Sequence, residues 1–277
     1  MTGRSHIVHA WDGLALHARE WGDGPGLPLL CLPGLVRSCE DFADFAARHA
    51  GRRRVVGLDY LGRGRSGRTR DASRYEPEPC LRDILDVCAA LHLHRVVAVG
   101  TSYGGLLAMG LAAIRPALLA AVVLNDIGPE LGAAGEAFLR GFVADDPALP
   151  DLDAAVAHLR HCLPYLSLST DAEWRRFATL TYVPGADGRL HPMWDTRIAA
   201  WMVPPVRDLW PLFGALRPMR LLLVRGLHSN ILLQPTVEKM LALRPDMQVA
   251  EIPGIGHAPT LAEPQAARAI DGFLGAL

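Results

Sequence analysis

The pentapeptide Gly100-Thr101-Ser102-Tyr103-Gly104 contains the side chain of this sequence that is best placed to do chemistry. It directly follows the apolar residues 96–99, which form a predicted strand, and it begins a predicted helix. A serine between glycines at such a strand-to-helix turn has a strained backbone and an exposed hydroxyl. The start of the helix also offers free N–H groups to a developing oxyanion. The pattern therefore predicts that Ser102 is a nucleophile.

A serine nucleophile needs a base that accepts its proton, and His257 is the best candidate for that base. It lies in the segment 254–259, between the last predicted strand and the last predicted helix. We therefore expect its loop at the same end of the sheet as Ser102. His6, His9 and His17 fall within predicted strands, where structural or surface roles are expected.

Alternating strands and helices position these two residues in the predicted fold. The predicted strands are residues 5–11, 14–21, 27–32, 54–58, 95–99, 119–124, 220–224 and 248–252. The predicted helices between the later strands are residues 79–91, 103–115, 235–243 and 264–274. Asp12-Gly13 is a strong hairpin signal between the first two strands. The alternation that follows indicates a mostly parallel sheet with helices on both faces.

The alternation stops after residue 124 and resumes at residue 220. Between residues 129 and 217 there is no strong strand pattern, only the helix-like segments 133–142, 152–162 and 171–179. We therefore expect a core of residues 1–128 and 216–277, with residues 129–215 inserted as a helical cap, or lid. Its aromatic side chains are candidates for lining an apolar pocket: Tyr165, Trp194, Trp201 and Trp210.

Composition limits the classes of function. The 277 residues are 50% hydrophobic and carry a formal net charge of −1, so neither disorder nor an electrostatically attracted nucleic acid is expected. No apolar run is long enough for a membrane span or a signal peptide. The five cysteines show no CxxC spacing, which disfavours a disulfide framework or a zinc site. These features predict a cytoplasmic protein with a small-molecule substrate and no membrane partner, and they leave its oligomeric state open.

Several further motifs resemble those of the α/β-hydrolase family, and the resemblance extends over essentially the whole chain. Leu32-Pro33-Gly34-Leu35 resembles the oxyanion loop of that family, although members often carry His-Gly at Pro33-Gly34. Residues 59–66 match its D-x-x-G-x-G-x-S loop, and residues 124–130 resemble the start of the lid in a bacterial subgroup. The resemblance implies the α/β-hydrolase fold, Ser102 as nucleophile, and His257 as base. It also implies an oxyanion hole formed by the N–H groups of Leu35 and Tyr103.

The third member of the triad is ambiguous. In the family the acid usually follows the next-to-last strand, in a pattern like R-G-x-x-S-D, but here that pattern ends in Asn230. Asp126, after the neighbouring strand, is the residue we favour, because a carboxylate fixes the histidine tautomer and stabilises the imidazolium. Two other accounts stay open: the chain is a weakened or non-catalytic relative, or Asn230 is a natural or introduced change at the acid position.

These features predict a serine hydrolase that cleaves a small, largely apolar ester or related acyl compound through an acyl-enzyme. Thioesters, lactones and C–C bonds of diketones are cleaved by the same constellation, and the residues do not separate them. No organic cofactor and no metal is implied. The alternative is a catalytically weakened ligand-binding protein on a hydrolase scaffold, which only Asn230 favours.

Overall fold

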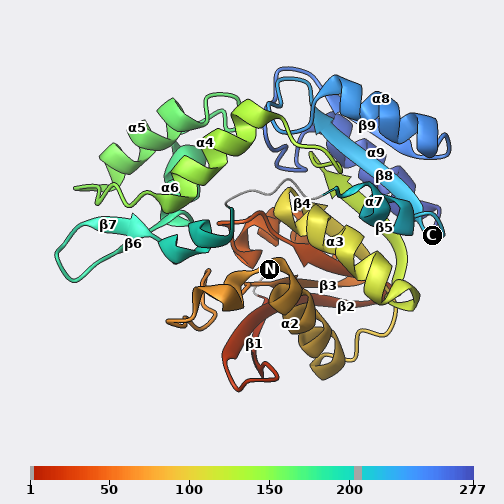
Figure 1. The fold of residues 1–277 in the computed structure, drawn as a ribbon, viewed down its shortest axis with the longest axis horizontal. Coiled ribbons are helices and arrows are strands. Elements are labelled where there is room, and N and C mark those ends of the chain that lie inside the picture. The colour runs from red at the N-terminus through yellow and green to blue at the C-terminus, as the bar shows by residue number, and fades with distance from the viewer. Residues whose placement is uncertain (1–2, 203–207) are drawn as a thin grey trace.

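A sheet of seven strands forms the centre of the protein in a computed structural model that describes residues 3–202 and 208–277 (Figure 1). Its strands are β1 (Arg4–His9), β2 (Ala15–Leu32), β3 (Arg53–Leu58), β4 (Val96–Thr101), β5 (Leu119–Asn125), β8 (Arg220–Gly226) and β9 (Gln248–Ile252). They are ordered β1-β2-β4-β5-β8-β9, and β3 pairs with β2. The pairs from β2·β4 onward are parallel, as the sequence predicts for this part of the sheet.

β2 is a single irregular strand of 18 residues, whereas the sequence predicts two strands, 14–21 and 27–32. Its first half runs antiparallel to β3, with Ala18 opposite Leu58. After the register shifts around Pro25, residues 29–31 lie opposite residues 55–57 in the same chain direction. β3 is therefore flanked by the two halves of β2, and each half corresponds to one of the predicted strands.

Alternate side chains of β4 belong to two separate cores. Val96 and Ala98 lie in one apolar cluster with residues of α2 (Pro77–Ala90), α3 (Tyr103–Ile114) and α8 (Gln234–Leu243). Val97 and Val99 lie in the other cluster, with residues of α1 (Ala43–His49) and α9 (Pro264–Gly275). Because successive strand side chains point to opposite faces, a continuous apolar run fills both layers. Figure 1 shows α2 and α3 in front of the strands and α9 behind them.

Most core helices begin and end within two residues of their predicted positions. The structure adds α1, a helix of seven residues for which the sequence pattern gives no prediction, and the short helix α7 (Trp210–Ala215). The 3₁₀ turns are η1 (Cys39–Phe42), η2 (Ala72–Tyr75), η3 (Pro116–Leu118) and η4 (Thr196–Met202). Within the described ranges, no helix is long and apolar enough to cross a membrane.

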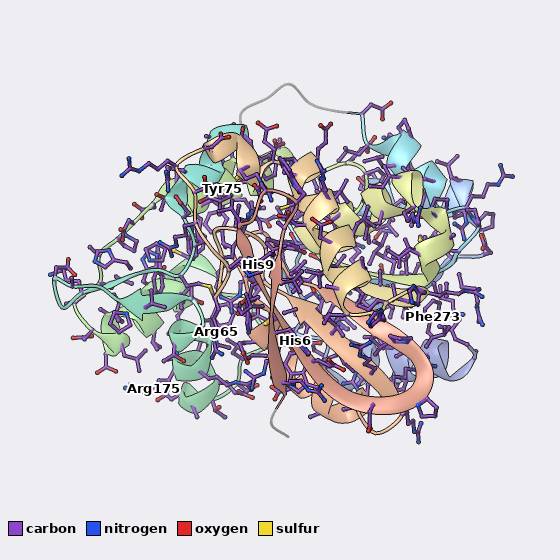
Figure 2. The ribbon with its side chains drawn as sticks, turned by 90° about the horizontal axis from the view of Figure 1, so that it is seen from below. His6, His9, Arg65, Tyr75, Arg175 and Phe273 are labelled. Carbon is purple, nitrogen blue, oxygen red and sulfur yellow. The ribbon has the colours of Figure 1, made fainter. Side chains whose placement is uncertain are left out.

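The inserted segment contains α4 (Ala133–Ala144), α5 (Leu152–Cys162) and α6 (Asp171–Thr179), which agree closely with the predicted helix-like segments. They lie together to one side of the sheet (Figure 1). Arg175, which is labelled in Figure 2, marks the position of α6. The expectation that this segment lacks strands is wrong. β6 (Tyr182–Pro184) and β7 (Leu190–Pro192) form an antiparallel hairpin, whose three-residue strands are too short to give an alternating pattern.

Candidate active site

Ser102 lies between the end of β4 and the first residue of α3, in the turn that the sequence predicts. Its backbone has φ 52° and ψ −118°, a left-handed conformation that costs about 1–3 kcal/mol for a residue with a side chain. A Cβ atom at Gly104 would lie 2.0 Å from the carbonyl oxygen of Leu32, and one at Gly100 would lie 2.5 Å from the oxygen of Gly104. Both glycines are therefore required because neighbouring backbone fills the space that a side chain would need.

His257 lies between β9 and α9 and contacts two of the predicted residues. Its Nε2 is 2.7 Å from Oγ of Ser102, and its Nδ1 is 2.7 Å from Oδ2 of Asp126. Asp126 follows β5 and is fully buried, and its Oδ1 accepts a hydrogen bond of 2.9 Å from the N–H of Gly226. The three side chains thus form one hydrogen-bonded series. By contrast, His6 and His9 lie on β1, an edge strand of the sheet (Figure 2).

The structure does not bring Asn230 to this series. Asn230 is exposed in the loop between β8 and α8, and its side chain makes no hydrogen bond to the described residues. Asp126 is placed differently because its strand, β5, is paired directly with β8, and its own N–H donates to the carbonyl of Val224 at 2.8 Å. The carboxylate that lies within hydrogen-bond distance of Nδ1 of His257 therefore comes from the end of β5, and not from the loop after β8.

The predicted oxyanion loop lies beside the nucleophile. A Cβ atom at Gly34 would be 4.0 Å from Cβ of Ser102, and Leu35 lines the same cavity as Ser102. Tyr103, whose N–H is the second predicted donor, is the first residue of α3, so no preceding turn of this helix accepts from that N–H. Its phenol is buried, and burial raises the pKa of Tyr103 well above its usual value, so the ring is neutral.

Asp59 begins the loop that follows β3, and its carboxylate is fully engaged. It accepts hydrogen bonds from the N–H groups of Cys39 and Arg65 and from Nδ1 of His17, at 2.7, 3.0 and 2.9 Å. His17, Cys39 and Asp59 are all buried. Burial next to this carboxylate raises the pKa of the Cys39 thiol well above its usual value, which favours the weakly ligating protonated form. We conclude that the cluster holds β2, η1 and this loop together.

A cavity of about 290 Å³ opens above Ser102 and His257, between the core and the inserted helices. Its wall on the inserted side is mainly apolar, with side chains that include Phe138, Leu139, Phe142, Leu159, Leu163 and Phe177. None of the four aromatic residues that the sequence suggests for this role lines it. Trp194 instead donates to the carbonyl of Val143 at 2.9 Å, and Trp210 donates to Glu130 at 2.9 Å.

Each of the two arginines at the cavity is paired with a carboxylate. Arg37 makes two hydrogen bonds of 2.6 Å to the carboxylate of Asp41, and its guanidinium lies 4.0 Å from the centre of the Phe177 ring. Arg176 of α6 pairs with Asp44 of α1 across the cavity mouth. The sequence alone does not predict these pairs. Arg176 and Asp44 are distant in the chain, and Arg37 and Asp41 are close in the chain but form no recognisable motif.

Comparison with known proteins agrees with this fold. The alpha/beta hydrolase fold family matches residues 28–259. 3-Hydroxybutyrate-oligomer hydrolase from Cupriavidus necator is 33% identical over 93% of this chain and 92% of its own length. 2-(Acetamidomethylene)succinate hydrolase from Mesorhizobium japonicum is 28% identical over 95% of this chain and 92% of its own length. The crystal structure of an alpha/beta hydrolase from Novosphingobium aromaticivorans is 39% identical, with a TM-score of 0.92 and 99% of each chain covered.

The chain therefore belongs to the alpha/beta hydrolase family. It is an enzyme with hydrolytic activity, as the names of its similar proteins and the matched family indicate.

Proposed function

We propose that this chain is a serine hydrolase that cleaves a small, largely apolar ester through an acyl-enzyme on Ser102. The observation that carries the proposal is the hydrogen-bonded series from Ser102 through His257 to Asp126, which opens into a mainly apolar cavity. In this arrangement Nε2 of His257 accepts the proton of Ser102 as its Oγ attacks the substrate carbonyl. The same nitrogen then returns that proton to the leaving alcohol.

Asp126 stabilises the imidazolium that forms at His257 during each proton transfer. Its second oxygen is held by the N–H of Gly226, which fixes the direction of the carboxylate. The N–H groups of Leu35 and Tyr103 stabilise the tetrahedral oxyanion. Water then attacks the acyl-enzyme with the assistance of His257 and releases the acid.

The cavity favours an uncharged acyl group. Its lining contains two arginines, and both are already paired, Arg37 with Asp41 and Arg176 with Asp44. A substrate carboxylate placed there would meet these carboxylates at short range. We propose that residues 129–215 act as the cap that determines acyl length. The similarity to 3-hydroxybutyrate-oligomer hydrolase makes esters of short aliphatic hydroxy acids the first substrates to test.

A ligand-binding protein on a hydrolase scaffold is the second candidate, and the amide at Asn230 is the feature that favours it. The contact between His257 and Asp126 weakens this alternative, because a carboxylate already serves the histidine without any contribution from Asn230.

A fluorophosphonate probe with mapping of its adduct tests the proposal directly. We expect labelling at Ser102, loss of labelling in Ser102→Ala, and hydrolysis of short-chain p-nitrophenyl esters by the wild type alone. An oligomer of 3-hydroxybutyrate and 2-(acetamidomethylene)succinate should be compared in parallel, with faster turnover expected for the oligomer. Absence of labelling at Ser102 would refute the proposed nucleophile, and preference for the dicarboxylate would refute the proposed substrate class.

A further inference from the structure

Arg63 is a fully buried cation directly behind the predicted oxyanion loop. It lies in the loop between β3 and η2, and its Nε donates to the carbonyl of Leu35 at 2.8 Å. Its Nη1 donates to the carbonyl of Leu61 at 2.8 Å. Within residues 3–202 and 208–277, its Nη2 has no hydrogen-bond partner and no carboxylate pairs with the guanidinium. A buried charge is costly unless it is strongly hydrogen-bonded, so an arginine without a carboxylate partner needs a specific explanation.

We propose that Arg63 is a positioning residue that orients the peptide groups of the oxyanion hole. The inference rests on the proposed function and deepens it, because it assigns a second role to the loop that begins at Asp59. Arg63 does not touch the substrate. It acts through the Leu35 carbonyl on one side and through the Tyr103 ring, 5.8 Å from its guanidinium carbon, on the other.

Three successive carbonyl groups of the oxyanion loop have separate hydrogen-bond donors. The Pro33 carbonyl accepts from the hydroxyl of Tyr60 at 3.1 Å, and the Gly34 carbonyl accepts from the N–H of Arg37 at 3.1 Å. The Leu35 carbonyl accepts from Arg63, which makes the shortest of the three bonds and the only one from a charged donor. Because a trans peptide is planar, fixing its carbonyl also fixes the direction of its N–H.

The N–H of Leu35 belongs to the middle one of these three peptides. Gly34 allows that peptide more rotation than any other residue would, since glycine has no side chain to restrict its backbone. The charged bond from Arg63 to the next carbonyl limits this rotation, and a hydrogen bond to a charged group is about twice as strong as a neutral one. Removal of Arg63 should therefore weaken the stabilisation of the oxyanion and leave the substrate cavity unchanged.

The test compares Arg63→Met and Arg63→Lys with Arg244→Met, measuring kcat, KM and melting temperature for each. Arg244 is the control for loss of a buried arginine. It donates to the Leu216 and Met219 carbonyls at 2.8 and 3.0 Å and also pairs with Asp246, away from the cavity. Each variant is assayed with p-nitrophenyl acetate and with its thiono analogue, whose sulfur is a poor hydrogen-bond acceptor. The ratio of the two kcat values measures how well the oxyanion hole is formed.

We expect Arg63→Met to lower kcat by about 10²-fold, with KM within about threefold of the wild type and a smaller preference for the oxygen ester. Arg63→Lys should retain part of that preference, and Arg244→Met should retain all of it. An unchanged oxygen-to-sulfur ratio in Arg63→Met would overturn the inference, as would a loss of kcat no larger than in the Arg244 control.

If Arg63→Met does not fold, Arg63→Lys decides the question by the same ratio. Tyr60→Phe is the comparison, since it removes the neutral hydrogen bond to the Pro33 carbonyl of the same loop and leaves Arg63 in place. The proposed function fails separately, if the wild type itself is not labelled at Ser102 by the fluorophosphonate. A labelled wild type whose Arg63 variants keep the full oxygen preference would refute only the role of Arg63.

Discussion

Replacing Asp126 by asparagine should place the proton of His257 on the wrong nitrogen. Oδ1 of Asp126 accepts from the N–H of Gly226, so the amide oxygen of the new side chain must face that N–H. Its NH₂ group then faces Nδ1 of His257, which must accept rather than donate. The proton moves to Nε2, the atom that lies 2.7 Å from Ser102 Oγ, and Nε2 can no longer act as a base.

We expect Asp126→Asn to lower kcat by about 10⁴-fold, the loss measured for the same change in a well-studied serine protease, which corresponds to about 5 kcal/mol. KM should change little, because Asp126 does not line the cavity. Steady-state kinetics with a short-chain p-nitrophenyl ester at several pH values, together with fluorophosphonate labelling rates, provide the measurement.

Asn230→Asp is the matched control, since it makes the reverse exchange on an exposed loop and should leave kcat within about twofold. The reasoning is refuted if Asp126→Asn keeps kcat within about tenfold of the wild type. It is also refuted if Asn230→Asp restores activity to the Asp126→Asn variant, because the loop after β8 would then supply the acid.

Three further predictions concern packing, stability and specificity. Gly104→Ala should destabilise the protein by about 1–3 kcal/mol or more, because its Cβ would lie 2.0 Å from a carbonyl oxygen. Gly272 lies in a helix and has open space around it, so Gly272→Ala should raise stability by about 0.5–1 kcal/mol. Thermal melts of both variants provide the measurement. Burial lowers the pKa of His49 from 6.5 to about 4, so between these pH values the unfolded chain binds a proton that the folded chain excludes. Acidification through this window should therefore lower the free energy of unfolding by up to about 3 kcal/mol. Urea unfolding at pH 7.5 and at pH 4.5 should show a smaller decrease in His49→Phe than in the wild type. An equal decrease in both proteins would contradict this prediction. Phe142→Leu should shift the preferred acyl chain of p-nitrophenyl esters to greater length, because Phe142 lines the cavity and leucine is smaller. An unchanged chain-length profile would contradict the assignment of the acyl pocket.

The sequence determines the parts of this protein that depend on local pattern. The glycines at positions 100 and 104 predict a tight turn around Ser102 with no space for a side chain at either position, and the close approaches at Gly100 and Gly104 agree with that reason. The position of His257 between the last strand and the last helix predicts its place at the same edge of the sheet. The alternation of strands and helices predicts the parallel part of the sheet, because continuous apolar strands must be covered on both faces. The catalytic roles of these residues remain predictions.

Only the tertiary structure decides which residue contacts His257 through Nδ1. Asp126 and Asn230 follow neighbouring strands, so their positions in the sequence place both near the same edge. The choice depends on loop conformation: Asp126 turns inward with φ 55° directly after its strand, whereas Asn230 lies four residues beyond its own strand and faces solvent. The burial of Arg63 is equally invisible in the sequence, because a surface loop and a buried loop can carry the same glycine-rich motif. Long-range packing, rather than local propensity, determines which polar side chains converge on the site.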